Sequence, residues 1–273
     1  MSAFSERTAL ITGAGTGLGR ALAEALGREG AVVYVSALHL VEAEPVAALI
    51  TQAGGRAYAV KLDAREVSDL DSVMSHIVAS HGSLDYVFNN AGIVFVGEFA
   101  EMKPAQVQNL AATNFVGPAL GMLTAIQYMR KQGAGHIVNV ASIGGLMPVS
   151  SMAMYSGTKH GLVGLSDSVR AEVSGDGIRI NTVCMGFVES DLLKRSDKGK
   201  GAEGGIGELL KSTSPISAEL AAQLVLRGVR RNQPYILFPA YTKAGWWIRR
   251  LLPNLANWIA RKSFERFRRA TAR

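Results

Sequence analysis

Tyr155 and Lys159 are four residues apart in a segment whose pattern predicts a helix, so their side chains can project from one face. A free tyrosine hydroxyl has a pKa of about 10 and is a poor base at neutral pH. An adjacent ammonium group favours the phenolate and lowers that pKa, which would make the hydroxyl a usable proton donor and acceptor. Taken alone, such a pair is more often an ordinary contact on a helix surface.

Three further groups have residue types suited to chemistry. Ser142 follows an apolar run and could donate a hydrogen bond to a carbonyl oxygen that gains negative charge, although serine is also common in turns. Residues 12–19 read TGAGTGLG, and glycines there would let a pyrophosphate approach the amides at a helix N-terminus. Both this stretch and the Asn-Asn-Ala-Gly of residues 89–92 also fit plain turns.

The elements that must position these residues alternate along the chain. Apolar, β-branched runs predict strands near 8–12, 32–36, 56–61, 86–89, 135–141, 179–183 and 235–238. Helix-like patterns lie between them, near 17–29, 42–53, 66–81, 104–131, 153–175 and 218–232. Repeated β-α-β units predict an α/β fold with a doubly wound parallel sheet of about seven strands, helices on both faces, and a C-terminal helical extension. Ligands bind at the carboxyl ends of such strands, and every candidate motif falls there or on the helix that follows.

On these residues the chain resembles the short-chain dehydrogenase/reductase family, in its compact branch, over about residues 8–238. Its TGxxxGxG and YxxxK motifs carry the resemblance. The resemblance implies an NAD(P)-dependent enzyme that interconverts an alcohol and a ketone by hydride transfer, with Tyr155 as general acid and base. Ser142 and Lys159 would assist, and Asn114 would hold a water that relays protons to Lys159. A homodimer or homotetramer is also implied.

The resemblance extends to the cofactor site. Asp63 would contact the adenine, and the backbone of Val188 would meet the nicotinamide carboxamide. The expected cofactor-binding residues are Gly13, Thr16, Gly17, Leu18, Gly19, Ala37, Leu38, Asp63, Asn90, Ala91, Gly92, Tyr155, Lys159, Gly186 and Val188.

Two departures from the family pattern matter. Met185-Gly186 replaces the usual Pro-Gly, which predicts a looser loop without implying loss of activity, and Ser190 replaces the usual threonine. Ala37 and Leu38 stand where other members carry an acid for the ribose hydroxyls or an arginine for a 2′-phosphate. His39 and Arg65 are candidates for binding such a phosphate. The choice between NAD(H) and NADP(H) therefore stays open.

The residues expected around the substrate are apolar, which predicts a hydrophobic secondary alcohol or ketone, although several could instead belong to the core. They are Val94, Met147, Met152, Phe187, Leu192 and Leu193. Five glycines within residues 198–207 cannot hold a rigid helix at low cost, so this stretch predicts a loop, either a solvent loop or a lid over the substrate.

Composition indicates one catalytic domain over residues 1–242 and an extension over 243–273. The chain has a single cysteine, Cys184, and lacks both a signal peptide pattern and an apolar run of membrane-spanning length, so a cytoplasmic enzyme is expected. The net charge of +7 is concentrated after residue 242, where nine basic residues face one acidic residue; the preceding residues hold 20 basic and 21 acidic side chains. We therefore expect no nucleic-acid binding, and no metal site.

The extension contains all three tryptophans, with apolar residues at roughly helical spacing and arginines between them. This pattern favours a helix that caps the cleft or docks on a subunit, and it also fits a helix lying peripherally on a membrane. Two alternatives to a simple alcohol dehydrogenase thus stay open: a catalytically silent nucleotide-binding scaffold, and a membrane-surface enzyme acting on a lipid-like substrate. The presence of all four candidate catalytic residues favours an enzyme. The physiological substrate, stereochemistry and reaction direction stay open.

Overall fold

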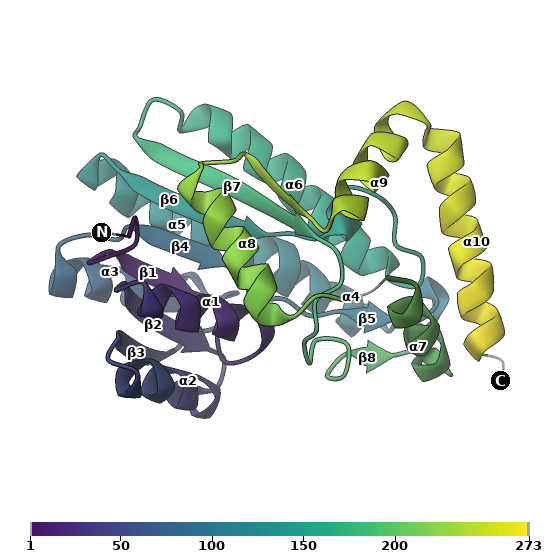
Figure 1. The fold of residues 1–273 in the computed structure, drawn as a ribbon, viewed down its shortest axis with the longest axis horizontal. Coiled ribbons are helices and arrows are strands. Elements are labelled where there is room, and N and C mark those ends of the chain that lie inside the picture. The colour runs from purple at the N-terminus through teal and green to yellow at the C-terminus, as the bar shows by residue number, and fades with distance from the viewer. Residues whose placement is uncertain (1, 214, 272–273) are drawn as a thin grey trace.

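The structure is a computed structural model that describes residues 2–213 and 215–271. It contains a large and a small sheet with helices around them (Figure 1). The strands are β1 (Thr8–Ile11), β2 (Val32–Ala37), β3 (Arg56–Lys61), β4 (Tyr86–Asn89), β5 (Phe95–Val96), β6 (Gly135–Val140), β7 (Ile178–Met185), β8 (Asp197–Lys198) and β9 (Tyr235–Phe238). The helices are α1 (Gly17–Arg28), α2 (Leu40–Gln52), α3 (Val67–His81), α4 (Pro104–Ala111), α5 (Gly117–Gln132), α6 (Ala153–Glu172), α7 (Ala202–Thr213), α8 (Ala218–Arg230), α9 (Ala240–Leu251) and α10 (Pro253–Thr271), with short turns η1 (Phe99–Glu101), η2 (Ala112–Val116) and η3 (Ile143–Gly145).

The large sheet confirms the predicted doubly wound α/β fold. Its seven strands are all parallel, in the order β3-β2-β1-β4-β6-β7-β9. The order reverses between β1 and β4, so the crevice between the carboxyl ends of these strands is the expected ligand site. The small sheet pairs β5 with β8 and places residues 197–198 beside this crevice.

Alternating residues of each strand enter two separate cores. Ala9, Ile11 and Val33 pack with α1, α2 and α8, whereas Leu10 and Tyr34 pack with α3, α5 and α6 on the opposite face. Burial on both faces explains why the strands read as continuous apolar runs. Among the described residues, none of the helices combines the length and hydropathy that a membrane span requires.

The helix predicted over 104–131 is interrupted. It consists of α4 and α5 joined by η2, a π-helical turn that contains the buried Asn114. A π-turn inserts one residue into a helix and commonly occurs at functional sites. Sequence periodicity did not reveal it because the turn leaves the overall helical path continuous.

The loop predicted over the glycine-rich residues 198–207 is wrong. Residues 197–198 form β8, and α7 begins at Ala202. The reason lies in α10, which packs on the glycine face of α7. A Cβ on Gly204 would lie 2.5 Å from the carbonyl oxygen of Ala270, and one on Gly205 would lie 2.2 Å from the ring of Phe267. Tertiary packing therefore outweighs the low helix propensity of glycine.

The C-terminal extension forms two helices that pack on the body. In α9, Trp246 contacts Tyr235 of β9, with ring centroids 5.2 Å apart. In Figure 1, α10 runs alongside α7 at the carboxyl edge of the large sheet. Of the basic residues noted in the extension, Arg273 lies outside the described residues. Intramolecular packing therefore accounts for one face of the extension.

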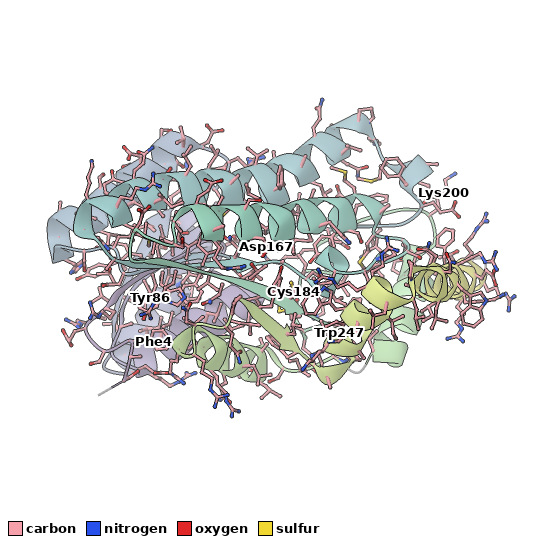
Figure 2. The ribbon with its side chains drawn as sticks, turned by 90° about the horizontal axis from the view of Figure 1, so that it is seen from above. Phe4, Tyr86, Asp167, Cys184, Lys200 and Trp247 are labelled. Carbon is pink, nitrogen blue, oxygen red and sulfur yellow. The ribbon has the colours of Figure 1, made fainter. Side chains whose placement is uncertain are left out.

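At the amino ends of the strands, His136 is buried, with its ring 5.4 Å from that of Tyr86 and a hydrogen bond to Asn181. Figure 2 shows Tyr86 on the other side of the molecule from Lys200. Burial lowers the pKa of His136 to about 4. An unfolded histidine titrates at about 6.5, so between these pH values the unfolded chain binds more protons than the folded chain. The free energy of unfolding should therefore fall as the pH drops from about 6.5 to about 4, by up to about 1.4 kcal/mol per pH unit.

Urea unfolding of the wild type, His136→Gln and His76→Gln across this pH range checks the expectation. His76 is exposed, so its variant should keep the wild-type slope, whereas His136→Gln should flatten it. Equal slopes in all three proteins would show that His136 is not the responsible group.

Candidate active site

Tyr155, Ser142 and Lys159 converge where β6 passes into η3 and faces the first turns of α6. The Tyr155 ring packs on Gly144, whose Cβ position lies 3.5 Å from two ring carbons. Ser142 lies close enough to the Tyr155 side chain to oppose the rise in the Tyr155 pKa, and it accepts a hydrogen bond from the Gly144 amide at 3.1 Å. Ser142 is thus both a turn-capping residue and a neighbour of the phenol. The structure brings these three predicted residues together.

Lys159 and Asn114 meet on either side of Gly92. The Lys159 Nζ atom donates to the carbonyl of Val140 at 2.8 Å. A Cβ on Gly92 would lie 3.3 Å from Oδ1 of Asn114 and 3.6 Å from Nζ of Lys159. The Asn114 amide accepts from the Ile93 amide and donates to the Ile93 carbonyl, both at 2.8 Å. The π-turn therefore lets Asn114 anchor the segment that follows β4, next to the lysine.

In the protein without ligands, the pKa of Tyr155 is raised and not lowered as expected. Burial raises the pKa of Tyr155, and the neighbouring Ser142 only opposes this effect. Lys159 lies 5.7 Å from the ring centroid and is itself buried, which lowers its pKa to about 8. Desolvation dominates because each charged form loses water, while the ammonium is directed toward the Val140 carbonyl. Tyr155 is therefore a protonated phenol at neutral pH.

The glycine-rich stretch forms a cradle between β1 and α1. Gly13 and Gly17 have φ values of 64° and 55°, a conformation that favours glycine. A Cβ on Gly19 would lie 2.4 Å from the Gly13 carbonyl oxygen, so no side chain fits there. Asn90 fixes this turn by donating to the carbonyls of Thr12 and Gly13 at 2.9 and 3.0 Å. Of the other expected cofactor residues, Ala91 lies against Gly13, while Thr16 and Leu18 flank the start of α1.

Charged residues that follow β3 are already paired. Asp63 receives the Arg65 guanidinium, which also donates to Asn109 at 3.1 Å, so Arg65 is not a free cation for a 2′-phosphate. The bond from Arg65 lowers the pKa of Asp63. Ala37 is buried at the end of β2, whereas Leu38 is 44% exposed.

An acidic residue that sequence reasoning missed lies beside the glycine cradle. A Cβ on Gly15 would be 2.8 Å from the Cβ of Glu42, and the Glu42 carboxylate pairs with Arg195 at 2.9 Å. Five residues before Arg195, Ser190 contacts the glycine cradle, because its Cβ lies 3.1 Å from the Cβ position of Gly17. The segment 190–195 therefore crosses the glycine cradle and is held to α2.

The loop expected to loosen without its proline is instead anchored. Strand β7 continues through Met185, which pairs with Phe238. The Phe187 amide donates to the Tyr241 hydroxyl of α9 at 3.1 Å, and a Cβ on Gly186 would collide with that hydroxyl. Val188 forms a parallel bridge with Ile216. Contacts from the C-terminal region replace the constraint that proline provides.

Comparison with known proteins identifies the family. The model of the family described as short chain dehydrogenase matches residues 7–201. The chain belongs to the short-chain dehydrogenase/reductase family. The probable oxidoreductase EphD of Mycobacterium tuberculosis (strain ATCC 25618 / H37Rv) is 30% identical over 270 residues, covering 94% of this chain and 45% of EphD. The chain thus spans less than half the length of EphD. The cyclohexanol dehydrogenase of Acinetobacter sp. (strain SE19) is 34% identical over 191 residues, covering 70% of this chain and 76% of that protein.

Solved structures agree with the fold of this family member. A short chain dehydrogenase/reductase from Burkholderia phymatum, in complex with NAD, has a TM-score of 0.85 at 23% identity and covers 93% of this chain and 96% of its own. A metagenomic short-chain oxidoreductase in complex with NADP has a TM-score of 0.65 at 34% identity, with coverages of 68% and 85%. The first supports the fold alone, because its identity is low.

In this short-chain dehydrogenase/reductase, four of the six expected substrate-lining residues gather in the apolar cluster that contains Tyr155. These four are Val94, Met152, Phe187 and Leu193. Met147 instead packs against α9, with its sulfur 2.7 Å from the Cβ position of Gly245, and Leu192 is 37% exposed. These two residues therefore lie outside the cluster, Met147 against α9 and Leu192 at the surface.

The cluster also contains residues that the sequence pattern did not assign to the site. Ile206 of α7 and Phe264 and Phe267 of α10 belong to it. The aromatic spacing of the extension was the one available indication. The family match ends at residue 201, so both helices that close this cluster lie beyond it.

Proposed function

We propose that this chain is an NAD(P)-dependent oxidoreductase that interconverts a hydrophobic secondary alcohol and its ketone. The observation that carries the proposal is the convergence of Tyr155, Ser142 and Lys159 at the carboxyl edge of the sheet, beside a glycine cradle and within an apolar cluster. That edge is where open α/β sheets bind ligands.

The cradle fits a nicotinamide dinucleotide. Gly13, Gly17 and Gly19 leave backbone amides open at the start of α1, whose first turn has neither an acidic residue nor a side-chain cap. A pyrophosphate suits such a helix N-terminus. Asn90, Ala91 and Gly92 would flank it, with Gly186 and Val188 on the other side of the crevice. When bound, the dinucleotide supplies or accepts the hydride.

The chain's own residues would handle the proton. In reduction, the Tyr155 hydroxyl donates its proton to the ketone oxygen, and in oxidation the phenolate accepts the alcohol proton. Ser142 donates a hydrogen bond to the same oxygen and stabilises its negative charge. Lys159 stabilises the phenolate that forms once Tyr155 has given up its proton. Asn114, which anchors Ile93 next to the lysine, would hold the water that relays protons to Lys159.

The apolar cluster supports the substrate class. A ring or chain of carbon atoms would be stabilised among Val94, Met152 and Phe187, whereas a sugar or charged metabolite would lose hydration there without new partners. The name of the cyclohexanol dehydrogenase, a relative at 34% identity, points in the same direction.

The test is the absorbance of reduced nicotinamide with NAD(H) and NADP(H) in parallel, against a panel of apolar and small polar alcohols and ketones. We expect turnover with the apolar members. A clear preference for small polar substrates would overturn the substrate class. Tight dinucleotide binding without any turnover would favour the catalytically silent scaffold.

A homodimer or homotetramer, as the family resemblance implies, is also part of the proposal. Light scattering, which measures the mass of the assembly in solution, tests it.

We further propose that Glu42 favours NAD(H) over NADP(H). An acid near the end of the second strand typically binds the ribose hydroxyls and repels a 2′-phosphate. Glu42 is in the first turn of α2, which follows β2, and it lies against Gly15 of the glycine cradle. Glu42→Gln removes this negative charge and leaves the paired Arg195 without its carboxylate, so it should raise the NADP(H)-to-NAD(H) ratio of kcat/KM by roughly tenfold.

The matched control for this prediction is Glu44→Gln, an exposed acid on the same helix. It should leave the ratio unchanged. If both variants shift the ratio alike, the effect reflects overall charge, and Glu42 is not a selectivity residue.

A further inference from the structure

The corner between α9 and α10 presents large apolar side chains to solvent. In Figure 1 this corner projects beyond the large sheet, at the end of α10 that is far from the C-terminus. We call it the elbow, and its exposed members are Trp247 (48% exposed), Leu251 (69%), Leu252 (54%), Leu255 (41%) and Trp258 (52%). All five lie between residues 247 and 258, where α9 ends and α10 begins.

Packing of the two helices on the body does not use these side chains. The inner face of α9 is occupied by Trp246, which contacts Tyr235, and by the buried Thr242. The inner face of α10 carries Ala256 and Phe267, which are 0% and 7% exposed. Both helices therefore have apolar side chains on two sides, and only one of these sides packs on the body.

The two helices that meet at the elbow carry an excess of positive charge, and Arg249 and Arg250 adjoin the elbow in the last turn of α9. The only acid in α9 and α10, Glu265, is paired with Lys262 and Arg261. Arg268 pairs with Glu98 of the body. Among the side chains that the structure describes, no carboxylate lies within 4.0 Å of the charged nitrogens of the five other basic residues, Lys243, Arg249, Arg250, Arg266 and Arg269. These five charges are available to a negatively charged partner.

We propose that the elbow docks on the surface of an anionic lipid bilayer. Exposed tryptophans and leucines with arginines around them fit the boundary between headgroups and acyl chains. Juxtaposed basic residues add attraction to anionic lipids. A second copy of this chain is the poorer occupant, because a two-fold contact through the elbow would bring these arginines against one another.

Docking would also place the bilayer near the proposed substrate site. From the elbow, α10 runs along α7, and its Phe264 and Phe267 belong to the cluster around Tyr155. The Ser150 hydroxyl, just before α6, donates to the Ala260 carbonyl of α10 at 2.7 Å. One helix thus connects the lipid-facing corner with the apolar cluster around Tyr155. The docking itself does not depend on the proposed activity.

Vesicle co-sedimentation of the full chain tests the proposal without any assay of turnover. We expect binding to vesicles of equal parts phosphatidylcholine and phosphatidylglycerol, little binding to phosphatidylcholine alone, and release at high salt. Leu251→Ser with Leu252→Ser should weaken binding at least about tenfold, since each leucine loses apolar burial. Arg249→Gln with Arg266→Gln should weaken it and reduce its salt dependence.

Leu49→Ser with Leu220→Ser is the matched control, because these leucines on α2 and α8 are similarly exposed, at 44% and 46%. This control should bind vesicles as the wild type does, and circular dichroism of every variant verifies folding. Equal sedimentation with neutral and anionic vesicles, or an elbow variant that binds like the control, would overturn the proposal. So would an elbow variant that changes the oligomeric mass by light scattering while vesicle binding is unchanged, which would assign the elbow to contacts between copies.

Discussion

Tyr155→Phe is expected to lower kcat by about 10²- to 10⁴-fold, the usual contribution of a positioned acid–base group. The substitution removes only the hydroxyl, and the ring that packs on Gly144 is retained. Dinucleotide affinity should fall far less than kcat, because most of the expected cofactor contacts, including the glycine cradle, come from other elements. Steady-state turnover and dinucleotide titration by fluorescence, measured on the same preparation, separate the two effects.

Tyr128→Phe is the matched control for this prediction. It removes a tyrosine hydroxyl from α5, where the group donates to Asp71 at the surface. It should leave kcat near the wild-type value. If Tyr155→Phe retains comparable turnover, the proton comes from another group, and the proposed role of Tyr155 is wrong even if the chain is an oxidoreductase.

The sequence predicted those parts of the site that depend on local spacing. Tyr155 and Lys159 are one helical turn apart, and Ser142 follows a strand whose hydrophobic pattern is unmistakable. Once the order of strands and helices is known, the doubly wound topology places their carboxyl ends together. The fold and the convergence of these residues therefore follow from short-range patterns.

The parts that were missed depend on contacts between distant segments. Glu42 and Arg195 are separated by 153 positions, and no local pattern indicates that they pair. The helix α7 forms despite its glycines because α10 needs a surface without side chains, and this requirement is visible only when both helices are placed. The pKa of Tyr155 was expected to fall because Lys159 was considered and burial was not.

Phe267→Ala is expected to lower the free energy of unfolding by about 3 kcal/mol or more, in the range for removal of a buried phenylalanine. Phe267 is 7% exposed, and its ring lies on Gly205 of α7. The cavity would be left between the two helices that close the apolar cluster around Tyr155. The KM for an apolar substrate should therefore rise more than the KM for the dinucleotide. Urea unfolding and steady-state kinetics measure these two effects.

Trp258→Ala distinguishes the loss of this contact from a general weakening of α10. Trp258 is a larger side chain on the same helix, but it is 52% exposed. In lipid-free buffer its removal should lower the free energy of unfolding by less than about 1 kcal/mol, because substitutions at surface positions have small effects. Gly205→Leu tests the same contact from the side of α7, because the leucine side chain would occupy the space of the Phe267 ring and displace α10. If Phe267→Ala and Trp258→Ala destabilise equally, α10 is not fixed by its contact with α7. The cluster around Tyr155 would then have to keep its shape without that helix.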